Sequence, residues 1–559
     1  IFENPIRMKL QLISDFNLEL LKRNLESKNV AEIDEVEVCK YGQLYQSIFS
    51  LKEDLSSVRF IWSLPENHIH EFKKALIAED IRRDILIEEI DTYATSIIDL
   101  AKRSKNVLVP TWCKLYHYQT YGISDWKIEM GIARIISDMN IRLSENFSNI
   151  ANIYLIDSSD WNLNSKEYRN QKLWYLTKVP FQPKVFSKVS ETICTSLDAL
   201  NGKAKKLIVV DLDNTLWGGV IGDVDFNGIN IGGHNHIGEA YKDFQKSLLA
   251  LHNRGVLLAI SSKNQEKIAM KAFDYNPEMV LKKEHFAAWE INWDDKAKNI
   301  IKIANDINIG LDSIVFIDDN PVERDQVKTT LPDVYVPDWS IDPSLYSTTL
   351  NRMRCFDQGY ITTDDKNRTK TYLENKNRNE SKTKVVNKTD WLMQLETEVE
   401  VNKLNKINLN RVAQLFQKTN QFNLTTRRFS EVEIESYYSK EENSLLTVNV
   451  KDKFGELGLV GIIGLSINKD NKVLVSDLIL SCRAMGRGIE ESMLYIINKL
   501  VFNYKAKGFE IEYKKTNRNN PVLKFLKESN LISKNNITFN SKSTLDYNYK
   551  LPVKIKFNF

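Results

Sequence analysis

The chain has 559 residues, of which 42% are hydrophobic and 10% aromatic, a length and composition typical of roughly two to four packed domains. It has no run of about eighteen apolar residues, which argues against a membrane-spanning helix and a membrane partner. Five scattered cysteines form neither a disulfide framework nor a zinc-binding spacing, and the N-terminus lacks a secretory signal, so we expect a cytoplasmic protein.

The net charge of +3 is unevenly distributed along the chain. Residues 401–559 carry 26 Lys and Arg against 15 Asp and Glu, a net charge of +11, whereas the first 400 residues carry 51 against 59, a net charge of −8. A basic C-terminal third indicates an acidic partner. Its basic residues form no dense run and accompany no nucleic-acid-binding motif, so we expect a small acidic protein and no nucleic acid.

Residues 1–195 alternate apolar strands with helical stretches and predict an α/β domain. The expected strands are KLQLIS (9–14), NVLVP (106–110) and ANIYLID (151–157), and a helix is expected over 130–147. The segment LISDFN resembles the opening motif of SGNH-type hydrolases, with Ser14 at the nucleophile position. That chemistry needs a later Asp-x-x-His pair, and none of the 7 histidines follows an Asp at that spacing. We therefore expect an SGNH-like domain that is non-catalytic and serves docking or dimerisation.

Residues 196–363 predict a doubly wound, parallel sheet. The expected strands are LIVVD (207–211), GVLLAI (255–260), SIVFID (313–318) and VYV (334–336), with helices between them. The first of these is a continuous β-branched run, typical of a strand buried on both faces. These elements fill the connections of the block, so the sequence predicts an open site without a cap domain.

Polar side chains stand at the ends of these strands, where parallel α/β sheets bind their ligands. The set comprises Asp211, Asp213, Ser262, Asp318 and Asp319, and Lys296 joins it from the expected start of a helix. Carboxylates this close repel one another unless a cation lies between them. Together with a hydroxyl and an amine that can hold phosphate oxygens, they predict an Mg²⁺-assisted phosphoryl-transfer site.

The stretches DLDNTLWGG, SSKN, INWDDKAKN and FIDDNPVER stand in the motif order of the haloacid dehalogenase superfamily, which this block resembles. The resemblance implies a Rossmann-like core in which Asp211 is the nucleophile that becomes an aspartyl phosphate. Asp213 is then the general acid/base, and Ser262 and Lys296 hold the phosphoryl group. The implied metal shell consists of Asp211, the backbone carbonyl of Asp213, Asp319 as the more direct ligand, and Asp318 beside it.

The remaining chain predicts a linker and a third domain. Residues 364–389 are almost wholly polar and predict a solvated helix or linker. Residues 390–559 predict an α+β domain, in which LLTVNV (445–450), LVGIIGLSI (459–467) and VLVSDLIL (473–480) form an antiparallel meander. A helix is expected to begin near Gly488.

The stretch DLILSCRAMGRGIEESML places Arg483, Gly486, Arg487 and Gly488 between a strand and a helix. Glycines let the backbone approach a phosphate, and N–H groups at a helix start stabilise its charge. The stretch resembles the pyrophosphate-binding loop of acyl-CoA N-acyltransferases and also suits the phosphate of a phosphopantetheine arm. An ordinary strand-to-helix turn is the alternative.

With QKTNQFNLTTRRFS (417–430) and KDKFGELGLVG (451–461), the chain resembles the FkbH-like family over nearly its whole length. The family is associated with polyketide biosynthesis. The resemblance implies dephosphorylation of 1,3-bisphosphoglycerate or a related acyl phosphate and transfer of the glyceryl group, as a thioester, to an acyl carrier protein. It implies Mg²⁺ and the carrier's phosphopantetheine arm as co-substrate, and it leaves open a place within a larger polyketide synthase.

A thioester product requires a thiol nucleophile, and Cys482 is the one cysteine within a motif, with Arg483 beside it to favour the thiolate. Direct attack by the carrier thiol, with Cys482 as a packing residue, is the alternative. Other functions stay open: a capless Mg²⁺-dependent phosphatase without acyl transfer, an acyl-CoA-dependent N-acyltransferase, or a non-catalytic scaffold. The intact set of phosphatase motifs argues against the last two.

Overall fold

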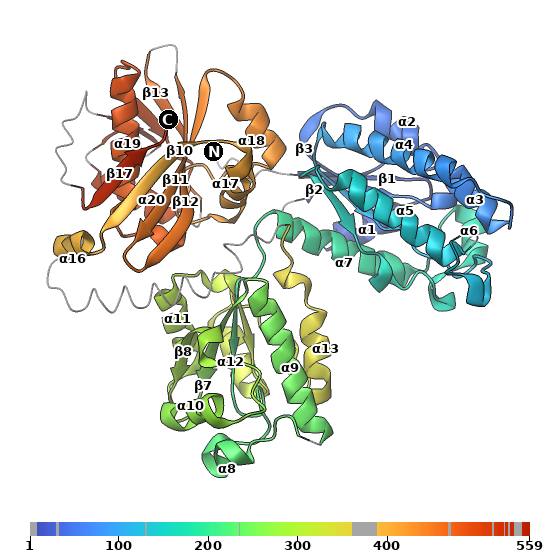
Figure 1. Ribbon diagram of the computed structural model, residues 1–559, viewed down its shortest axis with the longest axis horizontal. Coiled ribbons are helices and arrows are strands. Elements are labelled where there is room, and N and C mark those ends of the chain that lie inside the picture. Colours follow the sequence, from blue (N-terminus) through green and yellow to red (C-terminus); the bar gives the residue numbers. More distant parts are fainter. Residues whose placement is uncertain are drawn as a thin grey trace. The chain divides into compact units, whose positions relative to one another are not determined.

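The computed structural model describes residues 8–28, 33–128, 131–233, 235–359, 388–467, 471–516, 519–529, 531–534, 537–541 and 551–559. These residues belong to two compact units, one of residues 1–195 with 429–436 and one of residues 196–428 with 437–559. The described residues form three sheets, whose strands and helices are drawn in Figure 1. Residues 364–387 of the predicted linker, 364–389, lie outside the described residues.

The N-terminal domain is built on a parallel sheet in the order β2-β1-β3-β4-β5, the order of flavodoxin-like doubly wound folds. Its strands are β1 (Met8–Ser14), β2 (Ile33–Val38), β3 (Asp54–Trp62), β4 (Ser104–Pro110) and β5 (Ile153–Ile156). Its helices are α1 (Glu19–Ser27), α2 (Leu44–Ser50), α3 (His70–Leu76), α4 (Arg83–Ala101), α5 (Ile132–Phe147), α6 (Gln171–Thr177) and α7 (Pro183–Leu200). The predicted α/β class is confirmed; the SGNH-like assignment stays a prediction.

The middle domain holds a parallel sheet in the order β8-β7-β6-β9. The strands are β6 (Leu207–Val210), β7 (Leu257–Ser262), β8 (Phe286–Ile291) and β9 (Ile314–Ile317). The helices are α8 (Ile221–Gly228), α9 (His236–Asn253), α10 (Glu266–Tyr275), α11 (Lys296–Ile307), α12 (Pro321–Thr330) and α13 (Tyr346–Asn351).

Strand β6 is covered on both faces, as its sequence predicts. Ile208 and Val210 belong to one buried cluster and Leu207 and Val209 to another. Successive side chains of a strand point to opposite faces, so a core lies on each side of this sheet. The β-branched run is therefore the reason that Asp211 stands at the end of a rigid, central strand.

One strand of this domain was predicted wrongly. The segment VYV forms only an isolated bridge, between Tyr335 and Val315, whereas FAAWEI forms β8 beside β7. Alanine has little intrinsic preference for strands, so β8 is specified by its pairing with β7 more than by its own composition.

The C-terminal domain contains a mixed sheet in the order β15-β16-β14-β13-β12-β11-β10-β17. The strands are β10 (Thr397–Lys403), β11 (Asn443–Asp452), β12 (Gly455–Ile467), β13 (Val473–Leu480), β14 (Phe509–Glu512), β15 (Ile532–Lys534), β16 (Thr538–Asn540) and β17 (Val553–Phe557). The helices are α16 (Lys388–Gln394), α17 (Lys406–Lys418), α19 (Ile489–Asn503) and α20 (Asn520–Glu528). Helix α18 (Glu431–Tyr438) follows α17 in the chain and falls mostly within the first compact unit. Strands β10 to β13 form the predicted antiparallel meander.

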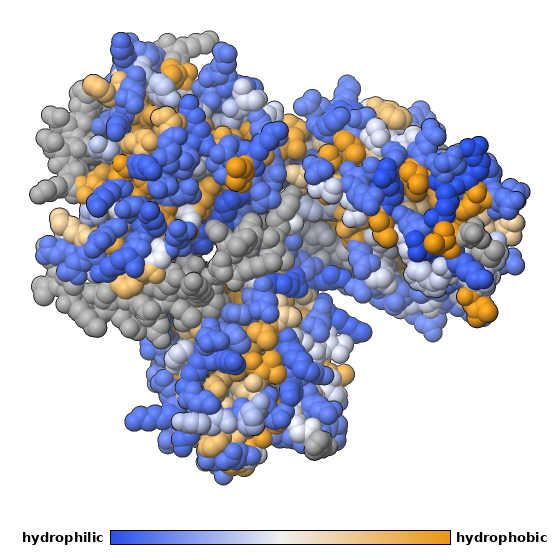
Figure 2. All heavy atoms as spheres, viewed as in Figure 1, coloured by the Kyte–Doolittle hydropathy of each residue, from blue (hydrophilic) through white to orange (hydrophobic). Residues whose placement is uncertain are grey.

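The surface drawn in Figure 2 is mainly hydrophilic, with hydrophobic residues scattered over it. Among the described residues, no helix is both long and apolar enough to cross a membrane.

Candidate active site

Three carboxylates meet at the carboxyl end of the middle sheet. Asp211 follows β6, and Asp318 and Asp319 follow β9, which pairs with β6 in parallel. One carboxylate oxygen from each residue lies within 4.8 Å of the other two, and the described part of the chain has no second such group of three acidic, histidine or cysteine side chains. Asp211 and Asp318 are buried, whereas Asp319 is half-buried. Neighbouring parallel strands thus bring the two predicted carboxylate motifs together.

Lys296 supplies a positive charge to this group. It is the first residue of α11, whose start is capped by the Asp295 side chain, which accepts a hydrogen bond from Ala297 N at 2.8 Å. Its Nζ lies 2.8 Å from Asp211 Oδ1 and also donates to Asp318 Oδ2. Burial by itself would lower the pKa of Lys296, but the charges of Asp211 and Asp318 outweigh it and raise that pKa. The lysine therefore stays charged beside the predicted nucleophile.

The acidic groups are only partly balanced by this lysine. Burial, and next the charge of Asp211, raise the pKa of Asp318, while Lys296 opposes that shift. The same two causes raise the pKa of Asp319. Three carboxylates against one lysine leave an excess of negative charge in a largely buried place, and hard carboxylate oxygens are the ligands that Mg²⁺ prefers. The residues fit an Mg²⁺ site formed by Asp211, Asp319 and Asp318.

Two residues without an assigned role hold the loop after β9. Thr215 Oγ1 donates to Asp319 Oδ1 at 3.3 Å and accepts from Asp319 N at 3.1 Å. Arg324 Nη1 donates to the carbonyl oxygens of Asp318 and Asp319, both at 2.7 Å. Neither Thr215 nor Arg324 was given a role in the sequence analysis. Their positions within the DLDNT and DDNPVER stretches were the available signal.

Asp213 stands apart from the three-carboxylate group. Its Oδ1 accepts hydrogen bonds from Trp217 Nε1 at 2.9 Å and Ile221 N at 3.1 Å, and its Oδ2 accepts one from Asn264 Nδ2 at 2.7 Å. Burial raises the pKa of Asp213, although these donors favour the ionised form. A fixed carboxyl whose pKa is raised can hold and return a proton, as a general acid/base requires. The metal contact predicted for its backbone carbonyl stays a prediction.

Ser262 and an ion pair complete this edge of the sheet. Ser262 is the last residue of β7, is buried, and accepts a hydrogen bond at its carbonyl from Asn292 N at 3.1 Å. The next residue, Lys263, places its Nζ 2.6 Å from Glu323 Oε1 on α12. Because β7 and β9 flank β6, this rim pair, Lys263 and Glu323, joins the two loops on either side of Asp211.

The predicted residues of the C-terminal domain lie between β13 and α19. Cys482 begins a short 3₁₀ helix and is half-buried. Gly486 and Gly488 have φ of +77° and +79°, a region in which other residues are strained. Gly486 N donates to Glu490 Oε1 at 2.6 Å, and Arg487 Nη1 lies 3.8 Å from Asp452 Oδ2. Both glycines thus use a backbone conformation that suits glycine, and one N–H group of the loop has a partner within the protein. Phosphate binding by this loop stays a prediction.

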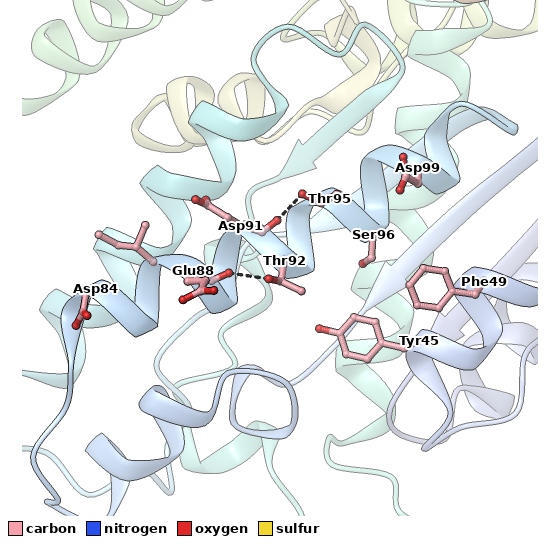
Figure 3. Close-up of a pocket in the computed structure, with 10 residues that line it drawn as sticks. Tyr45, Phe49, Asp84, Glu88, Asp91, Thr92, Thr95, Ser96 and Asp99 are labelled. Carbon is pink, nitrogen blue, oxygen red and sulfur yellow. Dashed lines mark hydrogen bonds between the residues drawn. The ribbon is translucent and has the colours of Figure 1, made fainter.

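A groove of about 780 Å³ lies on the N-terminal domain (Figure 3). It runs along α4, beside Tyr45 and Phe49 of α2, and contains none of the predicted site residues. Three of its four carboxylates already have cationic partners, in the pairs Asp84–Arg82, Asp91–Arg142 and Asp99–Lys102. We assign no function to this groove.

Ser14, at the nucleophile position of the SGNH-like motif, is buried, and its Oγ accepts a hydrogen bond from Phe16 N at 3.1 Å.

Comparison with known proteins points to the same chemistry. No family model and no curated protein matches the chain. The N-terminal part of the protein BF1531 from Bacteroides fragilis, which contains a phosphatase domain and was solved in complex with Mg, is 26% identical, with a TM-score of 0.57. The match covers 63% of this chain and 95% of that chain, more than the middle domain alone.

Two N-acetyltransferase structures match a smaller share. Mutant forms of the spermidine/spermine N-acetyltransferase SpeG from Vibrio cholerae are 12% identical over 26% of this chain and 91% of that chain, with a TM-score of 0.21. An acetyltransferase of the GNAT family from Staphylococcus aureus Mu50 is 10% identical over 25% and 97%, with a TM-score of 0.20.

The fold and the site define a mixed α/β protein with parallel sheets that carries a phosphatase-type domain with a carboxylate cluster suited to Mg²⁺. More particularly, the chain is similar to the phosphatase-containing part of the Bacteroides fragilis protein, which was itself solved with Mg.

Proposed function

We propose that the middle domain is an Mg²⁺-dependent phosphatase with Asp211 as its nucleophile. The observation that carries this proposal is that Lys296 forms ion pairs with both Asp211 and Asp318 inside the three-carboxylate group. Bound Mg²⁺ would supply positive charge to the phosphate oxygens. Lys296 holds the Asp211 carboxylate in place through the contact between its Nζ and Asp211 Oδ1, and Ser262 offers a hydroxyl to the phosphoryl group.

The reaction divides between two carboxyl groups. A bond forms between an Asp211 oxygen and phosphorus while the bond from phosphorus to the leaving oxygen breaks, and Asp213 gives its proton to that oxygen. Asp213 then takes a proton from water, which attacks the aspartyl phosphate at phosphorus. This step frees inorganic phosphate and restores Asp211. The hydrogen bonds from Trp217, Ile221 and Asn264 hold Asp213 for both proton transfers.

In its fuller form, the proposal is that the protein dephosphorylates 1,3-bisphosphoglycerate or a related acyl phosphate and transfers the glyceryl group to an acyl carrier protein, in the cytoplasm, in polyketide biosynthesis. The motif resemblance supports it, together with a basic C-terminal third that suits an acidic carrier. The phosphopantetheine arm would meet the loop formed by Arg483, Gly486, Arg487 and Gly488, and Cys482 would carry the acyl group. A phosphatase without acyl transfer is the second candidate, favoured by a complete site in the middle domain alone.

The deciding experiment compares Asp211→Asn with Asp223→Asn, the same change at an exposed residue of α8. Each protein is incubated with acyl phosphate donors, Mg²⁺ and phosphopantetheinylated carrier protein. Released phosphate and the intact mass of the carrier are both measured. Asp211→Asn is expected to lose the release of ester-bound phosphate, because an amide is not a competent nucleophile here, while a thiol can still expel the acyl phosphate; Asp223→Asn behaves as wild type. Phosphate release without a mass gain on the carrier would support the phosphatase activity and refute the proposed acyl transfer.

A further inference from the structure

Strands β13 and β14 of the C-terminal domain separate after a short paired region. They pair in parallel only where Val473–Val475 meets Phe509–Ile511. Strand β12 pairs with the other edge of β13 as far as Leu480. After Val475, the edge of β13 that faces β14 is therefore no longer paired with β14. We call the space between these two strands the slot.

A segment from the connection after α17 fills this slot. Residues 422–424, which we call the inserted strand, pair antiparallel with β13: Leu480 N donates to Phe422 O at 3.0 Å and Leu424 N donates to Leu478 O at 3.3 Å. On the other side, Lys514 N, just after β14, donates to Leu424 O at 3.0 Å. The inserted strand therefore lies between β13 and the continuation of β14, and takes hydrogen bonds from both.

The inserted strand is fixed by buried polar groups. Phe422, Asn423 and Leu424 are at most 1% exposed. Asn519 Nδ2 donates to the Asn423 carbonyl at 3.0 Å. Further along, Arg427 binds Asp477 of β13 through Nε at 3.1 Å and through a second guanidinium nitrogen. Asp477 is fully buried. Its ion pair with Arg427, which we call the Arg427–Asp477 latch, connects the segment after α17 to β13.

The hydrogen-bonding positions that the inserted strand occupies on β13 could also pair with the amide groups of a phosphopantetheine arm. An extended chain with amide groups can pair with a free strand edge as a peptide does, and the phosphopantetheine arm contains two amides, a terminal thiol and a phosphate. Its phosphate would lie at the turn into α19, where Gly486 N is bonded to the carboxylate of Glu490, itself 8% exposed. The inserted strand thus lies where the amides of the arm would pair with β13. The carboxylate of Glu490 lies near the place that the phosphate of the arm would take.

We propose that the inserted strand, residues 422–424, closes the phosphopantetheine site of the C-terminal domain, and that the arm binds β13 only when this strand withdraws and the Arg427–Asp477 latch opens. The inference rests on the proposed transfer to a carrier protein. If the open form is about 1% of the population, the apparent affinity for the arm is about 100-fold weaker than the intrinsic one. Docking of the whole carrier could then select the open form, while a free arm binds poorly.

Coenzyme A, which carries the same arm, is the probe. Its binding to the full chain is measured by isothermal titration calorimetry for wild type, Arg427→Gln, Glu490→Gln and the control Lys451→Gln, a surface residue of β11 paired with Glu398. Hydrogen exchange of the Leu424, Leu480 and Lys514 amides is followed in the same samples. Thermal unfolding and phosphate release confirm that each variant is folded.

Arg427→Gln is expected to bind coenzyme A about tenfold or more tightly than wild type, since it raises the open fraction. Saturation should expose the Leu424 and Lys514 amides while Leu480 stays protected, now by the ligand. Glu490→Gln should also bind more tightly, and Lys451→Gln should equal wild type. Tight wild-type binding with Leu424 still protected would refute the closure, and so would folded variants that fail to bind coenzyme A. Neither readout needs turnover at Asp211, so a failed phosphatase proposal would be recognised separately.

Discussion

Replacing Lys296 by methionine tests the electrostatic design of the middle domain most directly. The substitution keeps the length and volume of the side chain and removes its charge. Lys296 is 4% exposed and bonds both Asp211 and Asp318, so its loss leaves three carboxylates together without their counterion. Removing one partner of a buried ion pair costs about 3–5 kcal/mol. At about 2–4 °C per kcal/mol for a domain of this size, the unfolding transition of the middle domain should fall by about 6–20 °C without Mg²⁺.

Added Mg²⁺ should reverse much of this loss. A cation at about 100 times its dissociation constant stabilises the folded state by about 2.7 kcal/mol. Differential scanning calorimetry with EDTA and with Mg²⁺ measures both effects, and phosphate release measures the catalytic loss. Lys302→Met is the matched control, because Lys302 lies on the same helix but is 62% exposed in its pair with Glu290, and surface pairs contribute about 1 kcal/mol or less. Equal transition temperatures for the two variants in EDTA would show that Lys296 does not balance the buried carboxylates.

Three further outcomes follow from the same geometry. Asp319→Ala should raise the Mg²⁺ concentration needed for half-maximal phosphate release, since a carboxylate ligand is lost; an unchanged titration would place the ion elsewhere. Lys263→Met should raise KM for donors that carry a second phosphate more than for a phosphomonoester with a neutral leaving group, because Lys263 places an ammonium on the loop after β7, the neighbour of β6; equal changes would exclude Lys263 from substrate recognition. Cys482→Ala should abolish a hydroxylamine-sensitive, glyceryl-sized mass gain on the enzyme while phosphate release persists; normal carrier loading would show direct attack by the carrier thiol.

The sequence was most informative where chemistry and strand position coincide. The run before Asp211 could be predicted as a buried central strand because its β-branched residues are continuous. A carboxylate pair after another parallel strand then had to meet it, and Asp318 and Asp319 do. Lys296 was expected at the start of a helix and is the first residue of α11, which the Asp295 side chain caps.

Contacts between side chains distant in the sequence could not be read in this way. The hydrogen bond from Asn264 to Asp213 spans 51 residues, and nothing in either local pattern specifies the other partner. The inserted strand is a sharper case. Residues 422–424 lack the alternation of a full strand, and their pairing with β13 is fixed by the divergence of β14 and by the Arg427–Asp477 latch. Both are tertiary features, since they depend on where separate elements meet.

The connection between β6 and β7 decides what kind of reaction the middle domain can support. Within the described residues it contains α8 and α9 and no further sheet. Its contacts are directed inward: Ile221 N, at the start of α8, bonds Asp213, and Gln245 of α9 donates to the Leu216 carbonyl at 2.9 Å. The connection therefore orients Asp213, the proposed acid/base. In the proposed mechanism, no further sheet of the described residues in this connection shields the aspartyl phosphate from water, so that intermediate would be open to hydrolysis. This favours release of inorganic phosphate over its transfer, and it assigns any acyl transfer to groups other than Asp211.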